Sequence, residues 1–409
     1  MRSPLNGSAV QSGSNLLHSI DTTLHMSLLL FLLVLSVLVL IHEAGHFIAA
    51  RLFGVKADEF GYGFPPRLIG FVKENGKWKR VGRKDKGQYK NTIWSINWLP
   101  LGGFVRIKGE QPGEEDGKDS FHNVAVWKRI IILAAGVTMN WILATALFFA
   151  VFLVGANTLL EDLPAGAIVH DRAVRVTQVV SGSPAEKAGL KPNDAIVSID
   201  GTVPATYTDA QKMIAEKGEQ LITIMVDRGQ EHLQLVATPA YVKEADRVAL
   251  GIGIADIGKV TLPPAKAAIV SAQITYRYTQ AVLFGFGAII RDLVTGHGVN
   301  EGVSGPVGIA VMTGQVAQEG IMPLLQFAAI LSINLAVVNF LPIPALDGGR
   351  VLFLIIEKVR RKPMSRNLEA TIHNIAFLIL IGIILLVTIR DVGKFGGVIV
   401  AGAKGLVGM

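Results

Sequence analysis

Four long stretches of the chain consist almost entirely of apolar residues. A helix needs about 20 such residues to cross a bilayer, and each stretch is about that long or longer. The first could instead be a signal peptide, but Arg2 is the only base before it and no convincing small-residue cleavage site follows. We therefore predict four transmembrane helices, at Met26–Ala50, Ile130–Val154, Leu324–Ile343 and Ile372–Ile389.

Other segments show different patterns. Residues Thr92–Trp98 alternate between apolar and polar side chains, which is typical of hairpin strands. Between Val174 and Pro239, short strand patterns with Gly/Pro turns and one helix indicate a small α+β domain. Pro264–Val294 is helical in pattern but too polar for a fifth span, so it fits an amphipathic helix on the outer leaflet. The first 25 residues are expected to form a disordered tail.

The composition agrees with a membrane protein. Half of the 409 residues are hydrophobic and only 17% are charged, whereas a soluble domain has about 25% charged residues. This balance excludes a disordered chain. The absence of cysteine excludes a disulfide-stapled scaffold, a cysteine nucleophile and a thiolate metal site.

Basic residues are distributed unevenly about the predicted spans. The loop 51–129 has 16 Lys and Arg against 9 Asp and Glu, and the loop 350–366 has 6 against 1. The segment 157–275 has 11 against 14. Since cytoplasmic loops carry the excess of Lys and Arg, we predict both basic loops in the cytoplasm, and residues 157–320 and both termini outside. This placement accounts for the net charge of +7, so we expect no nucleic-acid partner.

His42-Glu43-Ala44-Gly45-His46, at the end of the first span, matches the motif H-E-x-x-H. His42 and His46 lie one turn apart on a helix, so both imidazoles can bind one metal ion. Glu43 projects beside them and could take a proton from an attacking water. An ionisable residue at the end of a span is costly and by default functional, which argues against an ordinary pair of helix histidines.

A zinc site needs a third protein ligand, and Asp347 is the best candidate. It follows the third span in the sequence Asn339-Phe340-Leu341-Pro342-Ile343-Pro344-Ala345-Leu346-Asp347-Gly348-Gly349. Spans one and three run in the same direction by the charge pattern, so Asp347 and the histidines lie at a similar depth. The prolines and the glycine pair should break this span locally, which is tolerated where backbone lines a wet cavity. Asn334 and Asn339 either form interhelical hydrogen bonds or bind an extended substrate backbone.

These motifs together resemble the site-2 protease family of intramembrane zinc metalloproteases, in its bacterial regulator of sigma-E protease type. The likeness covers nearly the whole chain and includes Ser304-Gly305-Pro306-Val307-Gly308-Ile309-Ala310 before the third span. It implies His42, His46 and Asp347 as ligands of Zn2+, Glu43 as the catalytic base, and Asn339 and Asn334 as substrate-binding residues. The second span departs from the family pattern Gly-Pro-x-x-Asn, because Gly136-Val137-Thr138-Met139-Asn140 lacks the proline.

The resemblance also assigns the regions between the spans. The region Val55–Lys108 resembles the family's membrane re-entrant β-loop beside the active site, whose edge could pair with a substrate strand; a plain basic cytoplasmic loop is the alternative. Val179–Leu190 with Asp194–Gly201 resembles one copy of a bacterial PDZ domain. Such a domain would either bind a peptide terminus or exclude bulky substrates.

The predicted fold is therefore a polytopic α-helical membrane protein with about four transmembrane helices, a re-entrant β-loop and an inserted extracytoplasmic PDZ domain of α+β class. The expected segments are an N-terminal tail (1–25), the first span with H-E-x-x-H (26–54), a basic cytoplasmic loop with the β-hairpin (55–129), the second span (130–155), the PDZ domain (165–260), an amphipathic helix and connector (264–320), the third span with Leu-Asp-Gly-Gly (322–349), a cytoplasmic loop (350–371), the fourth span (372–391) and a C-terminal tail (392–409).

The sequence thus predicts a zinc endopeptidase of the bacterial inner membrane, with its active site towards the cytoplasm, that cuts transmembrane segments of single-span membrane proteins. The resemblance implies trimmed anti-sigma factors and leftover signal peptides as substrates, and stress-response signalling as the role. As further partners it implies the lipid bilayer and a peptide ligand of the PDZ domain. Two other functions stay open. A non-proteolytic PDZ adaptor with a structural metal would not need Glu43, and a zinc transporter would need a hydrophilic path through the bilayer.

Overall fold

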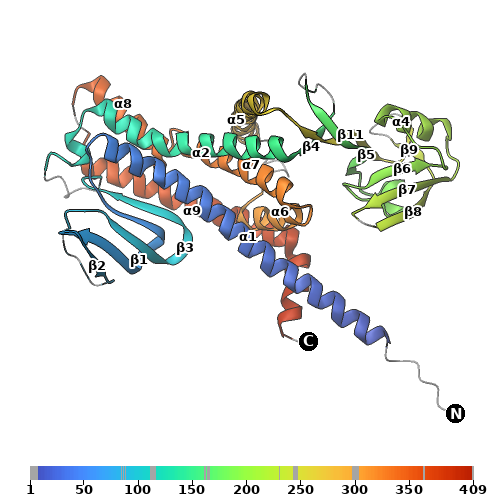
Figure 1. Ribbon diagram of the computed structural model, residues 1–409, viewed down its shortest axis with the longest axis horizontal. Helices are drawn as coiled ribbons and strands as arrows, with labels where there is room; N and C mark the ends of the chain where they lie inside the picture. Colours follow the sequence, from blue (N-terminus) through green and yellow to red (C-terminus); the bar gives the residue numbers. More distant parts are fainter. Residues whose placement is uncertain are drawn as a thin grey trace, which may run out of the picture. The chain divides into compact units, whose positions relative to one another are not determined.

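The computed structural model describes residues 8–83, 85, 87, 89–110, 117–160, 163, 166–229, 231–242, 247–296, 304–362 and 364–407 (Figure 1). The chain forms two compact units. The first consists of Met1–Phe148 with Ser271–Met409, and the second of Phe149–Val270. Helices make up most of the first unit, and a sheet makes up most of the second.

Four helices are long and apolar enough to cross a membrane, and they match the four predicted stretches. They are Met26–Leu52, Val126–Val154, Ile321–Phe340 and Leu368–Lys394. A membrane protein with four candidate spans is thereby confirmed. The helices in chain order are α1 (Ser8–Leu52), α2 (Val126–Val154), α5 (Pro264–Thr295), α6 (Pro306–Gln318), α7 (Ile321–Phe340), α8 (Asp347–Arg360) and α9 (Arg366–Val407), with a short 3-10 turn at Phe121–Asn123. Because α1 begins at Ser8, the helix extends into the segment 1–25 that is expected to be a tail.

Two glycines bring α1 and α2 into close contact. A Cβ on Gly45 of α1 would lie 2.4 Å from the carbonyl oxygen of Ala135 in α2. A Cβ on Gly136 of α2 would lie 2.4 Å from Nε2 of His46 in α1. Small residues of this kind let helix backbones approach closely in membranes. Gly45 is one residue before His46, so the close contact is at the H-E-x-x-H motif.

The third predicted span is broken, as its prolines indicate. Helix α7 ends at Phe340, and α8 begins at Asp347. Pro342 and Pro344 lack the N–H that a continuing helix needs, and Ala345 between the helices has φ of 80°. The chain then turns into α8, which occupies the first part of the segment 350–371 that is expected to be a loop.

Between α1 and α2 the chain forms an antiparallel sheet in the strand order β2-β1-β3. Its strands are β1 (Ala57–Glu74), β2 (Lys77–Val81) and β3 (Ile93–Ile107), and β3 contains the predicted strand at Thr92–Trp98 except for its first residue. Strand β3 folds back on β1, since Phe60 pairs with both Trp94 and Val105. The segment 103–107 of β3 thus lies at the edge of the sheet beside α1, where Gly103 packs on Leu40.

Residues 94–98 of β3 show the reverse of the pattern usual in a soluble protein. Trp94, Ile96 and Trp98 of β3 are exposed, whereas Ser95 and Asn97 between them are buried. An ion pair also joins the buried Glu59 to the partly buried Arg67 within the sheet. Apolar side chains outside and polar side chains inside are typical of strands that face lipid.

The second unit is an antiparallel six-stranded sheet in the order β4-β11-β5-β6-β7-β8. Two helices, α3 (Pro184–Lys187) and α4 (Tyr207–Glu216), pack with it around a core of Val, Ile and Leu side chains. Both helices have side-chain N-caps, Ser183 and Thr206. The strands are β4 (Ala156–Leu159), β5 (Ile168–Val179), β6 (Ala195–Ile199), β7 (Ile222–Arg228), β8 (Glu231–Ala237) and β11 (Ile252–Thr261), and a separate hairpin is formed by β9 (Ala240–Val242) and β10 (Arg247–Ala249).

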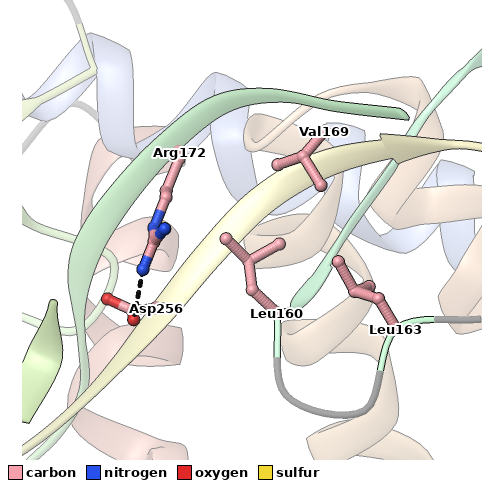
Figure 2. A pocket seen from close by; sticks show the side chains of 5 residues that line it. All are labelled: Leu160, Leu163, Val169, Arg172 and Asp256. Atoms are coloured by element: carbon pink, nitrogen blue, oxygen red, sulfur yellow. Dashed lines mark hydrogen bonds and ion pairs between the residues drawn. The ribbon is translucent and has the colours of Figure 1, made fainter. Parts of the chain in front are cut away.

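A cavity of about 360 Å³ lies in the second unit (Figure 2). Nη2 of Arg172 donates to Oδ2 of Asp256 at 3.0 Å. The buried Asp256 also accepts a hydrogen bond from the N–H of Tyr207 at 2.9 Å. This carboxylate therefore holds the start of α4 against β11. The lining residues are Leu160, Leu163, Val169, Arg172 and Asp256.

A buried ion pair in the second unit provides a test of its stability. The fully buried Asp194 accepts hydrogen bonds from Nε and Nη2 of Arg228, both at 2.7 Å. Asp194→Ala leaves the Arg228 charge without its partner. We expect the free energy of unfolding of this unit to fall by about 3 kcal/mol, the lower end for a buried pair because Arg228 is partly exposed.

Pulse proteolysis of the whole chain in increasing urea, following cleavage within residues 149–270, measures this loss. The control is Glu216→Ala, which removes an exposed i,i+4 pair with Lys212 in the same unit and should have a far smaller effect. Equal destabilisation by the two substitutions would contradict the role assigned to Asp194.

Candidate metal centre

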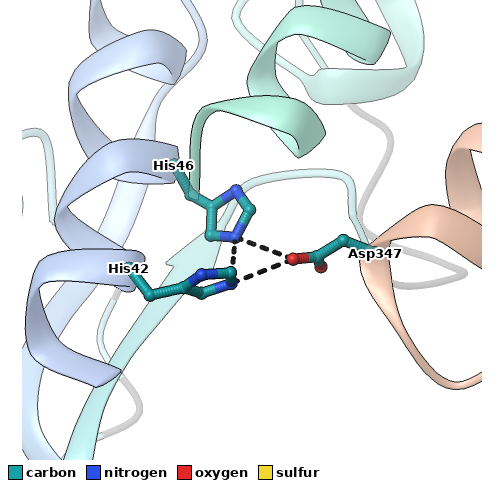
Figure 3. A group of neighbouring side chains, drawn as sticks. All are labelled: His42, His46 and Asp347. Carbon is teal, nitrogen blue, oxygen red and sulfur yellow. Dashed lines mark hydrogen bonds and ion pairs between the residues drawn. The ribbon is translucent and has the colours of Figure 1, made fainter. Parts of the chain in front are cut away.

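Three side chains from two helices of the first unit meet at one point (Figure 3). His42 and His46 come from α1, and Asp347 is the first residue of α8. Oδ2 of Asp347 lies 2.9 Å from Nε2 of His42 and 3.3 Å from Nε2 of His46. The two Nε2 atoms are 3.1 Å apart, and both imidazoles are buried. The structure thus brings together all three residues that the sequence predicts as ligands.

The geometry of this group fits one metal ion. Two ligand atoms that bind a tetrahedral zinc ion at about 2.0–2.1 Å lie about 3.3 Å apart. The three distances here, between 2.9 and 3.3 Å, are close to that value. Two imidazoles and one carboxylate also form the donor set of several zinc hydrolases, whose catalytic sites have three protein ligands. These residues can therefore hold a zinc ion.

Helix α2 contacts the other nitrogen of each imidazole. Nδ1 of His46 lies 2.8 Å from the main-chain oxygen of Ile132. A carbonyl oxygen only accepts, so Nδ1 carries the proton and Nε2 presents its lone pair. Nδ1 of His42 lies 3.2 Å from Nδ2 of Asn140. In the sequence Asn140 stands out only as the last residue of a motif, although a polar residue inside an apolar span is itself a signal of function.

Glu43, the expected base, lies beside the edge of the sheet. Its Oε2 accepts a hydrogen bond from the N–H of Val105 at 3.2 Å. Glu43 directly follows His42 in α1. The structure therefore places this carboxylate between the ligand group and the strand segment 103–107.

Two residues near Asp347 hold the start of α8 in place. Arg350, one turn further along, forms an ion pair with Glu110. Burial by itself lowers the pKa of the Arg350 guanidinium, but attraction to Glu110 and Asp347 outweighs it, so the pKa lies above its ordinary value and the charge is kept. Nδ1 of His373 in α9 accepts a hydrogen bond from the N–H of Ala345 at 2.8 Å. A cavity of about 210 Å³ is lined by Glu110, Arg350 and His373 among others.

The two asparagines expected to bind substrate lie in α7, outside the ligand group. Nδ2 of Asn334 donates to the main-chain oxygen of Ile330 at 2.9 Å, one turn earlier in the same helix. Asn339 is half-buried in the last turn of α7, beside the break that leads to Asp347. A role for either residue in substrate binding stays a prediction.

A metal-binding H-E-x-x-H helix long enough to cross a membrane, completed by a carboxylate after another such helix, defines a membrane-embedded metallopeptidase. The family model of peptidase family M50 matches residues 30–81 and 85–383. The chain therefore belongs to peptidase family M50, and the predicted resemblance to site-2 proteases is confirmed at the level of the family.

Three proteases named RasP are similar to this chain over nearly their whole length. The regulator of sigma-W protease RasP of Bacillus subtilis is 30% identical, and the alignment covers 89% of this chain and 97% of that protein. The zinc metalloprotease RasP of Geobacillus kaustophilus is 30% identical, with 90% of this chain and 98% of that protein covered. The zinc metalloprotease RasP of Bacillus licheniformis is 29% identical, with 89% and 98% covered.

A methyl group at Gly136 would project into the ligand group. Besides its close approach to His46, a Cβ there would lie 2.8 Å from Cε1 of His42. We expect Gly136→Ala to reduce bound zinc from about one ion per chain to well below that, measured by atomic absorption on protein purified in detergent. Gly382→Ala in α9, where a Cβ meets no atom within 4 Å, is the matched control and should keep its zinc. Full occupancy in Gly136→Ala would contradict this interpretation.

Proposed function

We propose that the chain is an intramembrane zinc endopeptidase that cleaves transmembrane segments of single-span membrane proteins. The observation that carries the proposal is the meeting of His42, His46 and Asp347, with ligand atoms 2.9–3.3 Å apart. The histidines are on a helix that is long enough to cross a membrane, and Asp347 follows another such helix. A catalytic centre at these helix ends reaches peptide bonds within or near the bilayer.

His42, His46 and Asp347 are the proposed zinc ligands, and the names of the RasP relatives support zinc as the metal. When bound, zinc lowers the pKa of a water towards neutrality and polarises the carbonyl of the scissile bond. Glu43 takes the proton from the attacking water and passes it to the leaving amide nitrogen. The hydrogen bond from Val105 holds the Glu43 carboxylate in place for these transfers.

A peptide bond inside a helix has to be exposed before it can be cut, because its carbonyl is hydrogen-bonded along the helix. The edge segment 103–107 of β3 is suited to hold such a substrate. The N–H of Val105 points to Glu43 and away from β1, so this side of the strand presents its backbone groups towards the base. A substrate strand that pairs there would be held extended beside Glu43. Asn339 and Asn334 are further candidates for binding the opened backbone.

The exposed apolar side chains of β3 support a re-entrant β-loop. Trp94, Ile96 and Trp98 form an apolar ridge on β3, which would be unfavourable in water. Strand β2 instead carries Lys77, Lys79 and Arg80, which belong in the aqueous or headgroup region. The sheet therefore enters the bilayer with the β3 ridge and keeps β2 outside the hydrocarbon.

The second unit is proposed to be an extracytoplasmic PDZ domain. Its antiparallel sheet, the helix start at Ser183-Pro184 and helix α4 support this assignment. Strand β4 pairs with β11 only at residues 257–260, so the beginning of β11 has no strand on that side among the described residues. A peptide end could pair with this part of β11 as an added strand. Alternatively, the domain could keep bulky substrates from the catalytic centre, which is the role we favour.

The charge pattern supports an inner-membrane protein with its catalytic centre towards the cytoplasm. The printed name of the Bacillus subtilis relative, a regulator of sigma-W protease, supports regulatory membrane proteins as substrates. Membrane-bound anti-sigma factors trimmed on the outside fit this class, and leftover signal peptides are second candidates. The competing function is a PDZ adaptor with a structural metal, which has no use for a base at Glu43.

The catalytic role is tested with purified protein in detergent and a tagged single-span substrate. Glu43→Gln keeps the shape of the side chain but removes the base, so cleavage should fall at least 10²-fold while zinc stays near one ion per chain. Chelator treatment of the wild type should abolish cleavage, and added zinc should restore it. A Glu43→Gln protein with wild-type cleavage would refute the proposed mechanism, and a wild type that binds no zinc would refute the enzyme itself.

The re-entrant loop is tested with two variants that each keep one of the five tryptophans and replace the other four by Phe. Trp98 on the ridge and Trp78 on β2 are similarly exposed, at 60% and 62%. In bilayers with brominated acyl chains, Trp98 fluorescence should be strongly quenched, because bromine quenches only on contact in the hydrocarbon. Trp78 is the matched control and should be quenched far less. Equal quenching of the two would mean that the sheet does not enter the bilayer in this orientation.

A further inference from the structure

Asn140 is a completely buried amide in the middle of an apolar helix. A buried amide is costly unless its polar atoms form hydrogen bonds. The main-chain oxygen of Asn140 accepts a hydrogen bond from Oγ of Ser332 at 2.9 Å. In the side-chain amide, Nδ2 lies 3.2 Å from Nδ1 of His42. Its Oδ1 is buried without a hydrogen-bond partner among the described residues. The present partners therefore do not explain why an amide is at this position.

The chemistry of a metal-binding His42 explains it. Nε2 of His42 faces the ligand group, so it has to present a lone pair, and the single proton of the neutral ring then lies on Nδ1. Such an Nδ1–H requires an acceptor. The amide nitrogen of Asn140 cannot accept, but half a turn of the amide about χ2 exchanges its nitrogen and oxygen. After this rotation Oδ1 accepts a hydrogen bond from Nδ1–H of His42, and Nδ2 takes the position in which Oδ1 has no partner among the described residues.

We propose that Asn140 is a positioning residue of the metal centre, which accepts a hydrogen bond from Nδ1 of His42 through Oδ1 when zinc is bound. This bond fixes the tautomer and the orientation of the ring. The main-chain oxygen of Ile132 does the same for His46. The inference rests on the zinc ligands proposed above. It gives α2, which lies outside the H-E-x-x-H motif, a role in orienting the ligands.

The spacing along α2 is consistent with this role. Ile132, Gly136 and Asn140 are four residues apart, so they share one side of the helix. The glycine in the middle lets the imidazoles approach, while the residues one turn before and after it contact their outer nitrogens. Among the described residues, Asn140 is the group within hydrogen-bond distance of Nδ1 of His42.

Two substitutions separate positioning from packing. Asn140→Leu has a similar shape but cannot accept a hydrogen bond, whereas Asn140→Asp accepts one well, since a carboxylate behind a zinc-bound histidine is a common arrangement. We expect Asn140→Leu to weaken zinc binding about 10–100-fold and Asn140→Asp to bind zinc at least as tightly as the wild type. The matched control is Ser332→Ala, which removes the bond to the Asn140 main chain and should leave zinc affinity unchanged.

Zinc affinity is measured on the whole chain in detergent by competition with a chelator of known affinity, and the absorption spectrum of the cobalt-loaded protein reports changes in the ligand geometry. Wild-type affinity in Asn140→Leu overturns the proposal, and so does an equal loss in Asn140→Asp and Asn140→Leu. A wild type that binds no zinc overturns the proposed function together with this inference, so the two failures are distinguishable.

If a variant does not fold, a measurement on the wild type tests the proposal. In zinc-loaded protein with ¹⁵N-labelled histidine, two histidines that are protonated at Nδ1 and bind zinc through Nε2 support the proposal. Zinc binding through Nδ1 of His42 overturns it.

Discussion

The close contact between α1 and α2 is the constraint on which the metal centre depends. Gly45 and Gly136 remove the side chains that would keep these helices apart, so the imidazoles of His42 and His46 lie against the backbone of α2. In hydrocarbon, helices associate through packing and interhelical hydrogen bonds, and small residues permit both. The same contact buries the rings and brings Ile132 and Asn140 of α2 to their outer nitrogens. A larger residue at either glycine would separate the histidines from the groups that orient them.

The position of Asp347 depends on a different feature, the interruption of the third predicted span. If the helix continued through residues 341–346, the direction of the Asp347 side chain would be set only by its position on that helix. Pro342 and Pro344 end α7 instead, and α8 starts with Asp347 at its first position. The break leaves backbone groups exposed, and the structure compensates for one of them with His373, which accepts from the N–H of Ala345. Such irregular backbone is tolerated at membrane depth because it lies within protein or beside a wet cavity.

The sheet between α1 and α2 combines two environments. Glu59 and Asn97 are buried in it and Arg67 is partly buried, whereas Trp94, Ile96 and Trp98 of β3 are exposed. The edge of the sheet lies beside Glu43. This edge suits the proposed function, because pairing with it would compensate a substrate for the helical hydrogen bonds that it loses beside the proposed base.

Much of this protein is determined by its sequence alone, because the relevant information is local. Twenty consecutive apolar residues indicate a span, and the four-residue spacing of His42 and His46 places both rings on one side of a helix in any context. Asp347 is a candidate ligand from the sequence because its motif follows a span that the charge pattern predicts to run in the same direction as the first. The family membership of the chain agrees with that reading.

Other features were decided only by the tertiary structure. Alternation in β3 predicts strands, but whether Trp98 or Asn97 faces outwards depends on the surroundings of the sheet. The extension of α1 to Ser8 and the helix α8 differ from the tail and the loop that are expected there. The contact of Asn140 with His42 joins residues 98 positions apart, and it exists only because two glycines let their helices meet. Local spacing can nominate a ligand, but the groups that orient it come from whichever helix packs against it.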